Sequence, residues 1–198
     1  MTTGSVTRTL AFNGYRVGSG SAWLESVSVD FDAVRLDALL EGLVETLGAV
    51  VIERSATNYE PIGASAGMLI GQPASAFAHL TESHAAIHTY PDTHPSLDLA
   101  TFRVECELSS CGPTSPIECL PLLLRTFGPD LLTLDLRDRG VLVSADGLVP
   151  AAAAPAPTAV AGFSCCKAQG GFGVYVREDL SGHETLVDGL AERLAAQA

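Results

Sequence analysis

Apolar residues recur with helical spacing in the stretch that follows Asp30 and Asp32, either of which can serve as the N-cap of a helix. Gly48 then marks the expected C-terminal end of this helix. Residues three and four positions apart lie on one face of a helix, so the pattern predicts an amphipathic helix. Its apolar positions are Val34, Leu36, Leu39, Leu40, Leu43, Val44 and Leu47.

Two further helices are predicted from capping boxes, in which a serine at the N-cap is followed three residues later by glutamate. The first begins at Ser115 and ends at Gly128, and Pro121 is expected to disturb its first turn. The second begins at Ser181. This last helix is expected to turn its apolar side chains inward, namely Leu186, Val187, Leu190 and Leu194.

Strands are predicted where apolar residues alternate with polar ones or form short runs. The alternation in residues 101–109 places Phe102, Val104, Cys106 and Leu108 on one face and leaves the other face polar. Pro91 is expected to stop a strand that begins at His84. The turn signal at 71–73 divides residues 64–80 into two short extended pieces. Further strands are predicted at 23–29, 49–54, 131–137, 141–149 and 172–176.

This order of elements predicts an α+β fold, with an antiparallel or mixed sheet and helices on one face. The first 149 residues are expected to form the main domain. The alanine- and proline-rich residues 150–162 are expected to form a linker. Residues 163–198 are then a C-terminal strand and helix, packed on the same domain.

The composition is that of a globular protein, with 47% hydrophobic and 17% charged residues and no apolar run long enough to cross a membrane. The polar N-terminus lacks the apolar segment of a secretory signal, so the five cysteines are expected to stay reduced in the cytoplasm. A net charge of -12 argues against a nucleic-acid partner. That charge suits a cationic ligand, or serves only to keep the protein soluble.

The candidate chemistry lies in residues 81–92, Thr-Glu-Ser-His-Ala-Ala-Ile-His-Thr-Tyr-Pro-Asp. This run resembles the self-processing site of the bacterial and archaeal S-adenosylmethionine decarboxylases, which use a pyruvoyl group. The resemblance extends over about residues 30–140. It implies an αβ sandwich of that family's type, and a homodimer in which the sheets of two protomers pack between outer helices.

The resemblance implies that the chain makes its own cofactor. Ser83 would attack the carbonyl of Glu82, and elimination with loss of ammonia would leave a pyruvoyl group at residue 83. The products would be two chains, 1–82 and 83–198. The pyruvoyl ketone would form a Schiff base with S-adenosylmethionine and accept electrons as carbon dioxide leaves. The product, S-adenosylmethioninamine, is an aminopropyl donor in spermidine and other polyamine biosynthesis.

The resemblance also implies roles for residues outside the processing site. His88 occupies the position of a histidine that assists processing. A serine that also assists matches Ser75 by its distance of eight residues from Ser83, whereas the glycine-rich surroundings of that serine match Ser65. Cys111, in Ser-Cys-Gly, matches the family's catalytic acid, with 93–103 the expected insertion before it. A thiol near a helix N-terminus suits proton transfer.

Other interpretations of the chain remain open at this stage. The enzyme could act on another amino acid or in specialised metabolism, or the chain could be an unprocessed relative with a regulatory or scaffolding role. A metal site is suggested by a cluster of possible ligands, namely His79, His84, His88, Asp92 and His94. However, His84 and His88 would lie about 13 Å apart on an extended strand, too far to share one ion. No metal is therefore expected.

Overall fold

The computed structural model describes residues 6–71, 83–94, 98–144, 147–152 and 154–197. The central strand is β1 (Val6–Gly18), which pairs with two strands from later in the chain. The other strands are β2 (Val50–Asn58), β3 (Ala64–Gly71), β4 (His84–His94), β5 (Leu99–Ser110), β6 (Leu131–Ser144), β7 (Gly147–Pro150), β8 (Phe163–Gln169) and β9 (Phe172–Arg177). The helices are α1 (Gly20–Val29), α2 (Ala33–Thr46), the 3-10 helix η1 (Pro116–Cys119), α3 (Leu120–Phe127) and α4 (Glu184–Ala196).

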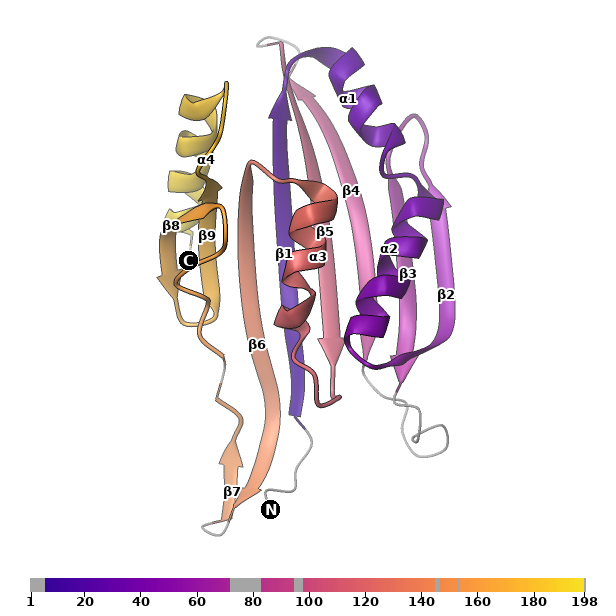
Figure 1. Ribbon diagram of the computed structural model, residues 1–198, viewed down its shortest axis with the longest axis vertical. Helices are drawn as coiled ribbons and strands as arrows, with labels where there is room; N and C mark the ends of the chain where they lie inside the picture. Colours follow the sequence, from indigo (N-terminus) through magenta and orange to yellow (C-terminus); the bar gives the residue numbers. More distant parts are fainter. Residues whose placement is uncertain (1–5, 72–82, 95–97, 145–146, 153, 198) are drawn as a thin grey trace.

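The strands form one large sheet in the order β2-β3-β4-β5-β1-β6-β9-β8, and β7 pairs only with the far end of β6 (Figure 1). Every pairing is antiparallel. The predicted α+β class with an antiparallel sheet is therefore confirmed. None of the helices in the described part of the chain is long and apolar enough to span a membrane.

Three helices cover one face of this sheet and form the main core with it. In Figure 1, α2 and α3 lie in front of the strands. Alternate residues of each strand point to this side, for example Leu132 and Leu134 on β6. They belong to the same buried cluster as Leu40 and Leu43 of α2. The prediction of helices on one face is correct for α1, α2 and α3.

Helix α4 packs on the opposite face. Leu131 is one residue away from Leu132 on β6, and it belongs to a separate buried cluster with Val174, Val187 and Ala191. Successive residues of a strand point to opposite faces, so this cluster lies on the other side of the sheet. The polar face, as we call this side, carries Asn13, Ser65, His84, His88, Glu105 and Glu107 on the strands away from α4.

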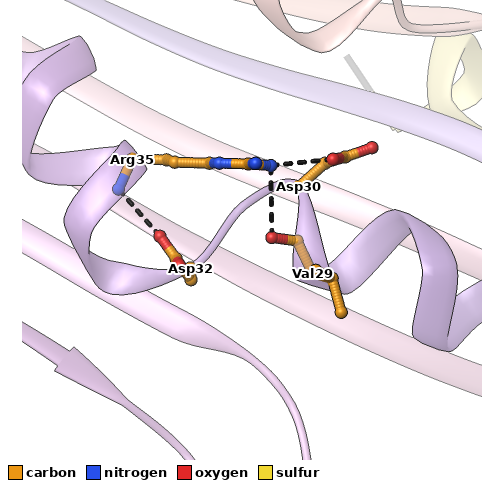
Figure 2. Close-up of polar contacts among 4 residues, drawn as sticks. All are labelled: Val29, Asp30, Asp32 and Arg35. Atoms are coloured by element: carbon orange, nitrogen blue, oxygen red, sulfur yellow. Dashed lines mark hydrogen bonds and ion pairs between the residues drawn. The ribbon is translucent and has the colours of Figure 1, made fainter.

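The predicted helix after Asp32 is α2, and Asp32 is its N-cap. The Arg35 backbone N–H donates to Oδ1 of Asp32 over 2.8 Å (Figure 2). The Arg35 guanidinium donates to Oδ1 of Asp30 and to the carbonyl oxygen of Val29, so it joins the end of α1 to the start of α2. Of the two candidate caps, the one that the helix uses is therefore Asp32.

The strand predicted at 23–29 is wrong, because these residues form most of helix α1. Leu24 and Val27 are the buried side chains, and their spacing of three residues is helical. The Trp23 ring lies against Gly18, where an added β-carbon would overlap the ring. Packing against the sheet thus overrides the alternating pattern in the sequence.

The prediction that Pro91 stops its strand is also wrong. Strand β4 continues to His94, and Pro91 lies opposite Phe102 of β5. The pairing of β4 with β3 ends at His88, so beyond that point the described residues pair with β4 as a strand on one side only. Proline is tolerated where its missing N–H faces no partner strand.

Both predicted capping boxes fail in detail although helices form there. Neither Ser115 nor the residue before α4 makes a side-chain capping bond, and the N-cap of α4 is His183. A 3-10 turn precedes α3, as expected from Pro121, and Gly128 ends α3 in the left-handed conformation. Leu186 is 46% exposed, so its predicted inward position is wrong.

The C-terminal region contributes two strands to the same sheet and a helix that packs on it. β9 pairs with β6, and β8, which the sequence pattern did not predict, pairs with β9. Within 150–162, Ala156 and Val160 are buried, and the Tyr175 hydroxyl donates to the carbonyl oxygen of Pro157. The expected linker is thus irregular in conformation but packed against the sheet.

Candidate active site

Ser83 lies immediately before β4 and is only 4% exposed. Its hydroxyl oxygen is 3.4 Å from Sγ of Cys111 and accepts a hydrogen bond of 3.3 Å from the Cys111 backbone N–H. The Ser83 carbonyl oxygen accepts from the backbone N–H of Ile70. Glu82, the other half of the predicted cleavage site, lies outside the described residues.

The hairpin of β4 and β5 brings Ser83 and Cys111 together. His84 pairs with Ser109, so the residues just outside the two strand ends become neighbours. The pairing continues without a break to His94 and Leu99. The long spacing between Ser83 and Cys111 is therefore taken up by a longer hairpin, and the two side chains still meet.

Three of the other four cysteines differ from Cys111 in their surroundings. Cys106 is buried in the core, and burial strongly raises its pKa. Burial also raises the pKa of Cys119 to about 12. Cys166 is exposed on β8, far along the sheet from Ser83. Cys111 is an exposed thiol that contacts the Ser83 hydroxyl.

Ser65 and His88 form a second pair on the polar face. They are cross-strand neighbours in the register of β3 and β4. Such partners have β-carbons about 5 Å apart. The hydroxyl of Ser65 shares a hydrogen bond of 2.6 Å with the hydroxyl of Tyr59. Ser75, the competing candidate, lies outside the described residues.

These two pairs of candidate residues are well separated within one chain. His88 follows Ser83 by five residues, and β4 is extended from His84 onward. At a rise of about 3.3 Å per residue, the two α-carbons are roughly 16 Å apart. The chain therefore presents two groups, Ser83 with Cys111 at the end of β4 and Ser65 with His88 further along the sheet.

The polar residues of β5 line the face between these groups. Nε2 of His84 donates to Oε1 of Glu107 over 2.9 Å. Glu105 is the cross-strand neighbour of His88. A cavity of about 350 Å³ on this face is lined by both carboxylates and both histidines, with Asn13 at its side. The alternating pattern of 101–109 predicted a polar face, but it did not single out either glutamate.

An aromatic and cationic cluster lies at the far end of this face. The guanidinium carbon of Arg103 is 4.1 Å from the centre of the Tyr90 ring, and Arg103 forms an ion pair with Glu105. Burial, followed by the hydrogen bond and the charge of Glu105, raises the pKa of Tyr90. Sequence analysis did not propose a role for this cluster.

The metal hypothesis receives no support from the described part of the chain. No group of three or more His, Cys, Asp or Glu side chains there is arranged to hold an ion. His84 is engaged by Glu107, and His79 lies outside the described residues.

Comparison with known proteins identifies the family. The family model for S-adenosylmethionine decarboxylase matches residues 28–140, which is more than half of the chain. The chain belongs to the S-adenosylmethionine decarboxylase family. The predicted resemblance over residues 30–140 is thereby confirmed. The matched region ends within β6, before β7, β8, β9 and α4.

Two similar relatives carry the name S-adenosylmethionine decarboxylase proenzyme. The protein from Azotobacter vinelandii is 34% identical, and that from Pseudomonas syringae is 33% identical. Each comparison covers 72% of this chain and 63% of the relative. The chain thus spans slightly less than two thirds of the length of these relatives.

Solved structures of the family are more distant. The adenosylmethionine decarboxylase of Aquifex aeolicus is 18% identical with a TM-score of 0.42, and the comparison covers 68% of this chain and 89% of that one. The Trypanosoma brucei AdoMetDC monomer is 16% identical with a TM-score of 0.45, over 86% of this chain and 65% of that one.

Proposed function

We propose that this protein is a self-cleaving, pyruvoyl-dependent decarboxylase of S-adenosylmethionine. The observation that carries the proposal is the contact of the buried Ser83 hydroxyl with Cys111, in a chain of this family. The residues present fit a self-derived pyruvoyl group, because the precursor serine and a thiol able to transfer a proton lie within 3.4 Å of each other.

Self-cleavage starts with attack of the Ser83 hydroxyl oxygen on the carbonyl carbon of Glu82. The peptide C–N bond breaks as the ester C–O bond forms, and the former amide nitrogen becomes the free amine of residue 83. Elimination then removes the proton from Cα of residue 83 and breaks the Cβ–O bond, which releases Glu82 as a carboxylate and leaves a carbon–carbon double bond. The resulting enamine shifts to an imine. Water replaces the nitrogen at residue 83, ammonia leaves, and a ketone remains. The Cys111 backbone N–H supports the first step, because it donates to the serine oxygen.

Ser65 and His88 assist cleavage in this proposal, and Ser65 is preferred over Ser75. Ser65 is supported by its register opposite His88 and by its hydrogen bond with Tyr59, which orients the hydroxyl. A serine and a histidine on neighbouring strands are within reach of proton transfer between them.

In the decarboxylation, the pyruvoyl group supplies an electron sink for the loss of carboxylate. Cys111 then returns a proton to the carbon that has lost carbon dioxide. Its exposure allows a substrate to reach the thiol, and its contact with residue 83 keeps the thiol beside the reacting centre. The product is S-adenosylmethioninamine, an aminopropyl donor for polyamine synthesis.

The polar face suits the charge of this substrate. S-adenosylmethionine carries a sulfonium cation, and the cavity of about 350 Å³ presents the carboxylates of Glu105 and Glu107. The net charge of -12 adds a weak attraction for a cation over the whole molecule.

The separation of the two groups supports a homodimer in this proposal. His88 is roughly 16 Å from Ser83 along the same strand, too far to transfer a proton at the Glu82–Ser83 bond. A second copy packed against the polar face would bring its own Ser65 and His88 to the first copy's Ser83. Each complete site would then contain residues of both protomers.

Intact mass spectrometry of the denatured wild-type protein and Ser83→Ala tests the proposal. We expect wild type to yield chains 1–82 and 83–198, the second lighter by one ammonia than a chain that begins with serine. Ser83→Ala is expected to stay uncut. If wild type also stays uncut after long incubation, the proposal is wrong and a regulatory or scaffolding relative becomes the better hypothesis. A cut chain that decarboxylates only another amino acid would correct the substrate.

A further inference from the structure

His84 is the residue directly after Ser83, and its side chain contacts Glu107 of β5. Its Nε2 lies 2.9 Å from Oε1 of Glu107, although both side chains are partly exposed. Glu107 is the cross-strand neighbour of Ala86, so the contact runs diagonally across the polar face. Diagonal neighbours on adjacent strands are within reach of long side chains.

The contact between His84 and Glu107 becomes more important for the position of residue 83 when the chain is cut. Before cleavage, the covalent bond to Glu82 restrains Ser83 from one side. After cleavage, residue 83 is a chain terminus, and termini that are not tied down are poorly ordered. The remaining restraints on this end are strand pairing of His84, the hydrogen bond from Ile70 to residue 83, and the contact of His84 with Glu107.

The His84 ring also stands between two hollows of the polar face. One cavity, of about 310 Å³, is lined by His84 together with Glu53, Ser55 and Gly67. The other, of about 350 Å³, is lined by His84 together with Glu105 and Glu107. Space is therefore open on both sides of the ring, and Glu107 is the side chain that holds the ring in one orientation.

We propose that Glu107 is a positioning residue that acts through His84 to hold residue 83 beside Cys111 once the chain has been cut. This inference rests on the proposed function. It assigns a role to a side chain of the predicted polar strand face that makes no contact with Ser83 itself. The pair is needed in the cut protein, whereas in the uncut chain the peptide bond to Glu82 provides the same restraint.

The test uses Glu107→Gln, His84→Gln and the double variant, each as the full chain. Glutamine keeps the length of the glutamate side chain, but its amide oxygen is a weaker hydrogen-bond acceptor for His84 than a carboxylate. We expect the rate of self-cleavage, followed by intact mass, to stay within twofold of wild type. In the cut protein, kcat is expected to fall about fivefold, as suits weakening of a partly exposed hydrogen bond. KM should stay unchanged in His84→Gln, because this variant keeps both carboxylates of the cavity.

Two further measurements separate positioning from a general loss of stability. Amide hydrogen exchange in 84–88 of the cut Glu107→Gln protein is expected to be faster than in wild type, and exchange in α2 is expected to stay the same. The double variant is expected to match His84→Gln in kcat, because Glu107 no longer positions residue 83 once His84 is gone.

Asp135→Asn is the matched control. Asp135 also lies on the polar face of the sheet, where Oδ2 forms an ion pair with Nε of Arg137 over 3.1 Å, and its side chain is 37% exposed against 46% for Glu107. It should leave kcat unchanged. An equal loss in Asp135→Asn, additive effects in the double variant, or an unchanged kcat in Glu107→Gln would each overturn the role of Glu107. An uncut wild-type chain would overturn the proposed function, and this inference with it.

Discussion

At the scale of single residues, the surroundings of each thiol decide its chemistry. Burial raises the pKa of Cys106 and of Cys119, so these thiols stay protonated and packed in the core. Cys111 differs because it is exposed and contacts Ser83. The family resemblance pointed to Cys111, and the structure adds the contact that a proton donor at residue 83 would need.

Replacement of this thiol should separate the two reactions. In Cys111→Ser, we expect self-cleavage to proceed, because Ser83 supplies the nucleophile and the backbone N–H at residue 111 remains. Decarboxylation should fall about 100-fold or more, which is the usual contribution of a general acid. The measurements are intact mass for cleavage and release of carbon dioxide for turnover.

Cys166→Ser serves as the control for Cys111→Ser, since Cys166 is an exposed cysteine on β8. It should match wild type in both assays. Full decarboxylation by Cys111→Ser would show that another group returns the proton.

At the scale of secondary structure elements, strand register decides which residues become neighbours. Ser65 and Ser75 are both candidates from the sequence for the serine that assists processing, one by the composition around it and the other by spacing. The pairing of β3 with β4 places Ser65 directly opposite His88. The Tyr59 hydroxyl, which no motif suggested, completes this group through its hydrogen bond to Ser65.

This register predicts different effects for the two serines. Ser65→Ala should slow self-cleavage at least about tenfold, because a group that assists proton transfer is lost. Ser75→Ala should be cut at the wild-type rate. The uncut fraction, measured by intact mass over time after synthesis, distinguishes the two variants. Slow cleavage in Ser75→Ala with normal cleavage in Ser65→Ala would reverse the assignment.

At the scale of the whole molecule, the two faces of the sheet have different roles. The helices α1, α2 and α3 close one face over an apolar core. On the other face, α4 covers Leu131 and its neighbours, while the strands from β3 to β1 present polar side chains. The two groups of candidate residues lie in this second region, separated by roughly 16 Å along β4.

A mixed dimer tests whether two copies complete each site. Ser83→Ala and His88→Ala should each stay uncut when made alone. When the two are made together, the His88→Ala chain should be cut, because its intact Ser83 meets His88 of the other protomer. Different tags on the two chains let intact mass identify which one is cut. Cleavage of His88→Ala on its own would show that His88 is not required.

The sequence by itself determined the local features and the family. The run from Thr81 to Asp92 identified the family, and helical spacing identified α2 with its cap at Asp32 among two candidates. Strict alternation identified β5 and its buried residues. These features are readable because the periods of helices and strands, and the chemistry of a short motif, depend on residues close together in the chain.

Only the tertiary structure decided which distant residues meet and which side of the sheet they occupy. In the structure, residues 23–29 form most of α1, and β4 continues through Pro91. Ser65 pairs with His88, and α4 packs on the polar face. Each of these outcomes depends on strand register or on packing between segments far apart in sequence. A one-residue change in register would move every side chain of a strand to the other face, and no local pattern specifies that choice.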